Sequence, residues 1–467
     1  MIRAKRRRRP SARLLLALAP AAALFLAVAA GRSSPPAEQA RSATFTLANG
    51  LRVILLEKRD LPLVHMVVAV NIGTKIETAE TNGLSHVLEH YVLFRGTNSR
   101  TADEISRDIR QHGAYFNAHT GLDIAQFELT LPAGQDEFAL ANQKDILYNL
   151  KIDPEALEAE KEVILEELNQ QEDDPLRSAT SLVYQKLFAG HPYALPIAGT
   201  RESISRLTAA QLDSYYKAYF TPVNSALAVV GDFSLPEMKN RVARIFGPLP
   251  PGEPPPAGIP PASGPKTDQV FTLAMDIKQA YCVIGLAGPD YNHPDQYAVD
   301  LLTEILGRGV NPMLGSALGR NRVRVDGLTM AYQAHRYGGV ILITLTFDPK
   351  FLPAGQRETL SFLRKVHTSN FSADEYPGAE RYYVYDYLKS AQNQVRFASE
   401  KYRELGLSQA VSMARHLILS NGQAEGGYLE SIGRITGSEL RRLAAKYFAA
   451  GKTVCVRVVP SGRENGP

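Results

Sequence analysis

The segment His86–His90 carries three side chains whose types and spacing suit chemistry at a metal ion. It reads HVLEH. Positions i, i+3 and i+4 of a helix share one face, so His86, Glu89 and His90 project together. Two imidazoles one turn apart can bind one zinc ion at about 2.0–2.1 Å each, and the glutamate beside them can accept a proton from water. This order reverses the HExxH zinc motif, and it predicts a zinc site on a helix.

A catalytic zinc ion also needs a third protein ligand and one open position for water. Carboxylates are concentrated in residues 153–175, which read DPEALEAEKEVILEELNQQEDDP. Asp153 as N-cap and Pro154 in the first turn predict a helix here. Glu160 and Glu167 are seven residues apart and lie on one face of that helix. The spacing leaves the choice of ligand open, because a solvated acidic face would show the same pattern.

Strands and helices are mixed around these two segments. Residues 44–58 read TFTLANGLRVILLEK and predict a β-hairpin turning at Asn49-Gly50, and residues 64–70 and 127–131 predict strands. Residues 84–94 and 154–171 predict helices. This order favours an α+β fold, in which helices pack on one side of a sheet rich in antiparallel strands.

The chain divides at a proline-rich segment. Residues 248–265 read PLPPGEPPPAGIPPASGP, with nine prolines in eighteen residues, which predicts a stiff extended linker. We place the linker at residues 248–266, between half-domains at 44–247 and 267–460. The halves are similar: RLTAAQLDSYYKAYF (206–220) and RITGSELRRLAAKYF (434–448) share residues in register, with Thr208 and Thr436 as expected N-caps. A duplicated domain explains this similarity.

The N-terminus has the pattern of an export signal. Residues 1–13 carry seven basic residues and no acidic one, an apolar run follows, and Ala27-Val28-Ala29 gives an A-x-A site. We expect a signal peptide over residues 1–29, cleavage near Ala29-Ala30 and a periplasmic or secreted protein, with membrane contact only through the signal. An uncleaved anchor is the alternative. Removing the signal changes the net charge from +4 to −3, which leaves no basic character that would favour nucleic acid.

The motifs resemble those of the pitrilysin/insulysin family of zinc peptidases with the inverted HxxEH motif, in the branch of mitochondrial processing peptidase. The resemblance is carried by NGLSHVLEHYVLFRGT, GAYFNAHTGLD (113–123), HPYALPIAGT (191–200) and ALAVVGDF (226–233), and it extends from about Thr44 to Val459. It implies His86, His90 and Glu167 as ligands of one zinc ion, Glu89 as general base and Glu160 as a supporting residue. The stretch from His90 to Arg95 is one residue longer than in the family, which suggests a bulged or shifted helix end.

The resemblance also implies substrate-binding residues and a partner chain. Asn117, on an edge strand, would hold the substrate backbone, and Tyr332 with Arg324 would steady the scissile carbonyl, with Arg322 as a rival arginine. The second half has VDLLT (299–303) where the first has HVLEH, so one metal site per chain is expected. Family members of this length pair around a chamber, which implies a homodimer or a heterodimer with a homologous chain.

These patterns together predict an exported zinc endopeptidase that hydrolyses peptides or small unfolded proteins, with manganese or cobalt able to replace zinc. The alternatives are a non-catalytic scaffold or partner subunit of the same fold, and a structural zinc site, which would be closed by four protein ligands. Cys282 and Cys455 lie in apolar runs; we expect core thiols, and a disulfide is possible in an exported protein.

Overall fold

The computed structural model of the chain describes residues 41–254, 258–376, 384–420 and 427–462. The signal peptide expected at residues 1–29 lies outside these ranges, as do residues 255–257 of the expected linker. The described residues from Ser42 onward belong to one compact unit. No helix in the described ranges has both the length and the apolar composition that crossing a membrane requires.

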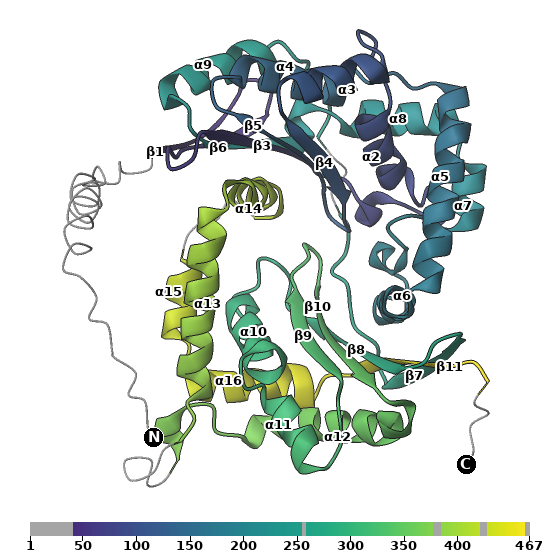
Figure 1. The fold of residues 1–467 in the computed structure, drawn as a ribbon, viewed down its shortest axis with the longest axis vertical. Coiled ribbons are helices and arrows are strands. Elements are labelled where there is room, and N and C mark those ends of the chain that lie inside the picture. Colours follow the sequence, from purple (N-terminus) through teal and green to yellow (C-terminus); the bar gives the residue numbers. More distant parts are fainter. Residues whose placement is uncertain (1–40, 255–257, 377–383, 421–426, 463–467) are drawn as a thin grey trace, which may run out of the picture. The chain divides into compact units, whose positions relative to one another are not determined.

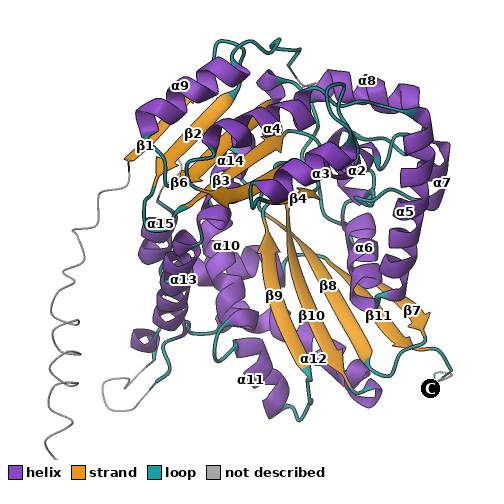
Figure 2. Ribbon diagram, turned by 45° about the horizontal axis from the view of Figure 1, so that its top comes forward, coloured by secondary structure: helices purple, strands orange, loops and turns teal. Residues whose placement is uncertain are grey.

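Six strands form the first sheet, in the order β1-β2-β6-β3-β5-β4 (Figures 1 and 2). The strand β3 pairs antiparallel with β5 and β6, β4 pairs antiparallel with β5, and β2 runs parallel to β6. The sheet is therefore mixed, with mostly antiparallel pairs. Its strands are β1 (Arg41–Thr46), β2 (Arg52–Glu57), β3 (Leu63–Val70), β4 (Tyr115–Thr120), β5 (Ala125–Pro132) and β6 (Ser225–Gly231).

The helices of the first half lie between these strands in sequence. The two helices that matter most for the site are α2 (Leu84–Phe94) and α5 (Pro154–Asp173). The others are α3 (Ala102–Gln111), α4 (Asp136–Tyr148), α6 (Pro175–Leu187), α7 (Arg201–Arg206), α8 (Ala209–Tyr219) and α9 (Leu235–Phe246), with short 3-10 turns η1 (Thr74–Ile76), η2 (Pro192–Ala194) and η3 (Pro222–Asn224).

The second sheet repeats the topology of the first. Its order is β7-β11-β8-β10-β9, with β7 parallel to β11 and the other pairs antiparallel. Replacing β2 to β6 by β7 to β11 in chain order converts the first sheet, without β1, into the second. Its strands are β7 (Gln269–Met275), β8 (Ala280–Gly288), β9 (Gly327–Gln333), β10 (Gly339–Phe347) and β11 (Thr453–Pro460).

The helices of the second half include two π-helical segments, η4 (Glu304–Arg308) directly after α10 and η8 (Ala444–Ala449) directly after α16. The α-helices are α10 (Gln296–Thr303), α11 (Met313–Arg320), α12 (Leu352–Lys365), α13 (Tyr387–Glu404), α14 (Gly406–Leu419), α15 (Tyr428–Arg434) and α16 (Gly437–Leu443), with 3-10 turns η5 (Pro349–Phe351), η6 (Val366–Thr368) and η7 (Ala373–Glu375).

Helices cover the central strands of each sheet on both faces. On one face, each sheet packs against helices of its own half, and these contacts form the two large apolar cores. The opposite face of the first sheet is covered by α14, which belongs to the second half, and the opposite face of the second sheet is covered by α6, which belongs to the first (Figure 1). Each half thus contributes one helix that packs against the sheet of the other half. The prediction that helices pack on one side of the sheet holds only for the helices that belong to the same half as that sheet.

The expected elements around the site are present at the expected residues. The helix expected at residues 84–94 is α2, and the helix expected at 154–171 is α5, which continues to Asp173. The strands expected at residues 64–70 and 127–131 lie within β3 and β5. Thr208 and Thr436 accept hydrogen bonds at the N-termini of α8 and α16, as predicted. β1 and β2 are neighbours joined by a turn in which Gly50 has φ 88°, a conformation that favours glycine.

Candidate metal centre

The helix α2 places His86, Glu89 and His90 on one side, as the spacing predicts. It is a regular α-helix through Phe94, so the longer stretch between His90 and Arg95 continues the helix and forms no bulge within it. Arg95 follows as the C-cap in an extended conformation. The helix packs against α5 and against the edge strand β4.

The helix α5 brings the carboxylates. The Asp153 side chain accepts hydrogen bonds from the backbone N–H groups of Glu155 and Ala156, and Pro154 occupies the first turn. The carboxylate satisfies two of the amides that a helix start leaves without partners. Glu160 is buried and Glu167 is half-buried.

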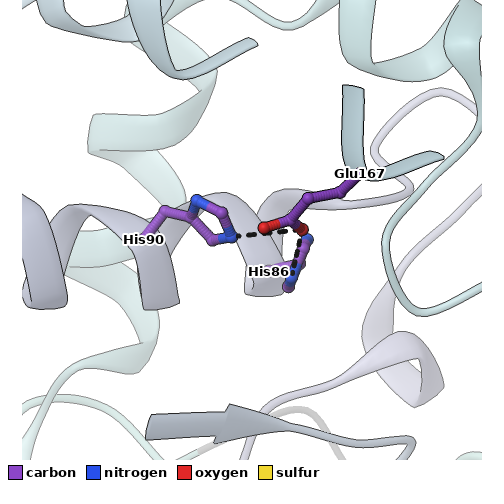
Figure 3. Close-up of side chains that lie close together, drawn as sticks. All are labelled: His86, His90 and Glu167. Atoms are coloured by element: carbon purple, nitrogen blue, oxygen red, sulfur yellow. Dashed lines mark ion pairs between the residues drawn. The ribbon is translucent and has the colours of Figure 1, made fainter. Parts of the chain in front are cut away.

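His86, His90 and Glu167 converge in space (Figure 3). Glu167 Oε2 lies 3.8 Å from His86 Nε2 and 3.6 Å from His90 Nε2. The ring centroids of the two histidines are 4.6 Å apart, and their planes are inclined by 72°. In the described part of the chain, these three residues form a group able to hold a metal ion, with ligand atoms within 4.8 Å of one another.

The donor set fits a zinc ion. Three ligands at about 2.0–2.1 Å from a tetrahedral ion lie roughly 3.3–3.4 Å apart, slightly less than the 3.8 Å and 3.6 Å that separate Glu167 Oε2 from the two imidazole nitrogens. Two imidazole nitrogens and one carboxylate oxygen are donors of the type that open zinc sites use. The Glu167 side chain is 39 % exposed, against 13 % for His86 and 5 % for His90, so the cluster is accessible from the side of Glu167.

The two imidazoles have different surroundings. His90 Nδ1 lies 2.7 Å from Glu160 Oε1, and Arg95 Nε donates to Glu160 Oε2 at 2.8 Å. Burial raises the pKa of Glu160, but the hydrogen bonds from His90 and Arg95 outweigh it, and the pKa is lowered. Burial likewise lowers the pKa of His90, but the hydrogen bond to Glu160 and the charge of Glu167 raise it overall. Burial lowers the pKa of His86 to about 3, so this ring is neutral.

Glu89 lies on the same helix with its side chain largely buried. Burial raises the pKa of its carboxyl group, while a hydrogen bond from Thr120 at the end of β4 and the charge of His90 act in the opposite direction. Thr120 thus connects the helix that carries the motif to the edge strand.

Asn117 lies on β4, which is at the edge of the first sheet as predicted. Its neighbour Ala118 faces the core, so Asn117 faces the other side of the strand. Asn117 Nδ2 donates to Tyr115 Oη at 3.0 Å. The structure therefore places this amide on an edge strand that contacts α2, and its role toward a substrate stays a prediction.

The two residues expected from the second half make contacts within that half. Arg324 is 78 % exposed and pairs with Asp326 at 3.4 Å. Tyr332 packs against the core of the second half, and its hydroxyl donates to Pro289 O at 2.8 Å. Among the described residues, no hydrogen bond or ion pair joins either side chain to the group of His86, His90 and Glu167, and their substrate roles stay predictions. Arg322, the rival arginine, has φ 58° just after α11.

Residues 299–303, expected to correspond to HVLEH, lie on α10 and its end, and they include no histidine. Cys282 on β8 and Cys455 on β11 are buried free thiols with their Sγ atoms 3.4 Å apart. They are core residues, as expected.

Three residues of the site were not predicted. Arg95 and Thr120 contact Glu160 and Glu89, and Glu77 binds the first turn of α2 through its carboxylate, which accepts from the N–H groups of Gly83 and Ser85 at 2.9 Å each. All three lie at or beyond the end of a helix or strand. The sequence offered a signal for Arg95 alone, namely a charged residue directly after the helix that carries the motif.

Two sheets that share one topology apart from β1, together with an HxxEH cluster able to hold a metal ion, define a two-part α+β protein with the inverted motif. Two family models match the chain: Insulinase (Peptidase family M16) over residues 52–201, and Peptidase M16 inactive domain over residues 206–381. The chain belongs to the M16, or insulinase, family of peptidases.

Similar proteins agree with this assignment. An uncharacterised zinc protease of Mycobacterium leprae is 30% identical over 274 residues, which cover 58% of this chain and 61% of that protein. A probable mitochondrial-processing peptidase subunit beta of Schizosaccharomyces pombe is 30% identical over 290 residues, or 60% of this chain and 62% of that one. These matches span less than two thirds of each relative. A protease from Helicobacter pylori has the same fold, with a TM-score of 0.80 at 21% identity, covering 90% of this chain and 100% of that one.

Proposed function

We propose that the protein is an exported zinc-dependent endopeptidase that hydrolyses peptides or small unfolded proteins. One observation carries the proposal: Glu167 Oε2 lies 3.8 Å from His86 Nε2 and 3.6 Å from His90 Nε2, and Glu89 projects from the same face of the helix that carries the two histidines. The family and the descriptions of the relatives as zinc proteases support the reaction class.

In this proposal His86, His90 and Glu167 hold the ion. When bound, zinc supplies a Lewis acid that polarises the scissile carbonyl group and makes water more acidic. Glu89 accepts the proton of the attacking water and returns it to the leaving amine. Glu160 accepts from His90 Nδ1–H, which fixes the ring with Nε2 toward the ion.

The substrate binds as an additional strand beside β4. An edge strand offers unpaired N–H and C=O groups along one side, and an extended peptide can pair with them. The strand β4 contacts α2, so a peptide paired with it passes close to Glu89. Asn117 would bind its backbone, and Tyr332 with Arg324 would steady the carbonyl group.

The partner and the compartment are part of the same proposal. One relative is described as a subunit, which supports pairing with a second copy or a homologous chain around a chamber. Sedimentation of the active protein as a monomer would contradict it. Export depends on the signal at residues 1–29, and N-terminal sequencing of the protein from the cell envelope tests the cleavage site near Ala29-Ala30.

The experiment is a peptide-library digest by the purified mature protein, with and without a chelator, on wild type and on Glu89→Gln. We expect chelation to stop cleavage, and Glu89→Gln to lower its rate by about 10²–10⁴-fold while one zinc ion per chain is retained, because the proton acceptor is lost and the ligands are not. Glu162→Gln is the matched control, since Glu162 is an exposed acid of α5, and it should cleave as wild type does.

Each other result rejects a defined part of the proposal. Normal cleavage by Glu89→Gln would reject Glu89 as the base. A wild-type protein that binds zinc without cleaving any peptide would favour the second candidate, a non-catalytic scaffold or partner subunit. The second family model, which describes an inactive domain, matches residues 206–381, whereas the HVLEH segment and Glu167 lie in the part that the peptidase model matches.

A further inference from the structure

The two proposed histidine ligands differ in the hydrogen bonding of Nδ1, the ring nitrogen that does not face the ion. His90 Nδ1 lies 2.7 Å from Glu160 Oε1. His86 Nδ1 is buried and has no hydrogen-bond partner among the described residues. A histidine ligand is oriented by the hydrogen bond that its other ring nitrogen makes. The geometry of the pair therefore depends on how firmly Glu160 is held.

Glu160 is held by Arg95. The guanidinium donates from Nε to Glu160 Oε2 at 2.8 Å, and its Nη2 lies 2.5 Å from the same oxygen. Each carboxylate oxygen thus has its own partner, Oε1 the imidazole and Oε2 the guanidinium. The Glu160 side chain is 2 % exposed, so water offers it little alternative bonding.

The backbone directs Arg95 toward this contact. Arg95 is the C-cap of α2, with φ −116° and ψ 169°, and its N–H still donates to Tyr91 O. The chain leaves the helix at this residue, which frees the side chain to reach α5. The helix that carries both histidines therefore also carries the cation that fixes the carboxylate behind one of them.

We propose that Arg95 is a positioning residue of the metal site, which fixes Glu160 with Oε1 toward His90 Nδ1 and so aims His90 Nε2 at the ion. This inference rests on the proposed function. Without the guanidinium, Glu160 is a buried carboxylate with one partner, and its plane is free to turn away from the imidazole. His90 then loses the hydrogen bond that fixes its orientation.

The test is the zinc affinity of the full mature chain, measured without substrate by competition with a chelating dye. We expect Arg95→Met to weaken zinc binding by about 10–100-fold, the range found when the outer partner of a ligand is removed. Arg95→Lys should recover part of the loss, because it restores a cation without the planar fork. Glu160→Gln should weaken zinc binding as much as Arg95→Met does. The double variant should bind zinc no more weakly than Glu160→Gln alone, because both residues act through one contact.

The control is Arg100→Met. Arg100 is an arginine of the same region that pairs with Asp108 and Asp145, so its loss removes ion pairs without touching Glu160. We expect normal zinc affinity. Equal affinity of Arg95→Met and wild type would overturn the inference, as would losses that add in the double variant. If Arg95→Met does not fold, the zinc affinity of Arg95→Lys, compared with that of the Arg95→Lys, Glu160→Gln double variant, decides whether the two residues act through one contact. A wild-type chain that binds neither zinc nor cobalt would reject the proposed function instead.

Discussion

At the scale of single residues, Glu77 gives the motif helix its start. The N-cap of α2 is Gly83, which offers no side-chain acceptor and has φ 101°. The Glu77 carboxylate supplies the acceptors that a capping side chain would provide. Its Oε2 accepts from Gly83 N–H and from Asn82 Nδ2, and its Oε1 accepts from Ser85 N–H. A carboxylate at this end also interacts favourably with the positive end of the helix dipole. The position of His86, one residue after Ser85, depends on these bonds.

Glu77→Ala should therefore destabilise the protein by about 2–3 kcal/mol, because two buried N–H groups lose their acceptor. Glu77→Gln keeps one acceptor oxygen and should lose about half as much. The measurement is urea unfolding of the mature chain. Glu80→Ala is the control: Glu80 is exposed, and its carboxylate accepts from the Thr78 hydroxyl, so the unfolding midpoint of this variant should match that of wild type. A Glu77→Ala midpoint equal to wild type would show that the helix start does not need the carboxylate.

Part of the site could be predicted from the sequence at this scale. The grouping of His86, Glu89 and His90 follows from helical spacing alone. Glu167 did not follow from spacing, since several glutamates of α5 fit equally well, and the resemblance to a family selected it. The role of Glu77 could not be predicted, and the only signal for Arg95 was its charge directly after the motif helix. The chain direction before and after a helix is set by contacts with other segments and not by a periodic pattern.

At the scale of elements, two glycines permit the exchange of helices between the halves. A Cβ atom on Gly285, in the middle of β8, would lie 2.3 Å from Val183 Cγ1 of α6. A Cβ atom on Gly406, the first residue of α14, would lie 2.3 Å from His65 Cδ2 of β3. The elements themselves were predictable from periodicity and caps. The sheet on which each helix packs was not, since an apolar helix face does not specify its partner.

Gly285→Ala should push α6 from the second sheet. We expect a loss of about 1–3 kcal/mol, the usual cost of overpacking, because the added methyl group meets a fully buried valine. Thermal or urea unfolding measures the loss. Gly433→Ala is the matched control, because Gly433 lies in α15 with nothing within 4 Å of an added Cβ, and alanine should leave stability equal or raise it by up to about 1 kcal/mol. Wild-type stability of Gly285→Ala would mean that α6 can move outward without cost.

At the scale of the whole molecule, a buried polar cluster joins the two halves. Asp123 lies in the turn between β4 and β5, and its carboxylate accepts from Arg336 N–H, in the turn between β9 and β10, at 3.0 Å and from the Tyr193 hydroxyl. His335 Nδ1 lies 3.6 Å from the same carboxylate. The hairpins that carry the two edge strands β4 and β9 therefore meet at one acid.

The end of α14 meets the same cluster. Arg52 donates to Leu417 O at 2.5 Å, and Arg336 donates to Ile418 O at 2.6 Å, which places cations at the negative end of that helix. Lys75 is also buried there, and its Nζ donates to Asp123 O and Asn71 Oδ1. This cluster could not be predicted from the sequence, because its members come from six separate segments.

Lys75 makes the stability of this contact depend on pH. Burial lowers its pKa from 10.5 to about 7; the charge of Asp123 acts in the opposite direction, and those of Arg336, Arg52 and Arg415 act in the same direction. Between these two pH values the unfolded chain carries a proton on Lys75 that the folded chain does not. The free energy of unfolding therefore rises with pH from about 7 toward 10.5, and below about 7 Lys75 adds no slope.

Lys75→Met should remove this slope. One proton of difference corresponds to at most about 1.4 kcal/mol per pH unit, so urea unfolding between about pH 7.5 and 9 should show wild type gaining stability relative to Lys75→Met. The difference between the two proteins isolates Lys75 from other groups that titrate in this range. Lys151→Met, which removes an exposed lysine, should keep the wild-type slope. Parallel pH profiles of wild type and Lys75→Met would mean that Lys75 keeps its proton in the folded protein, and that the contact between the halves holds a full positive charge.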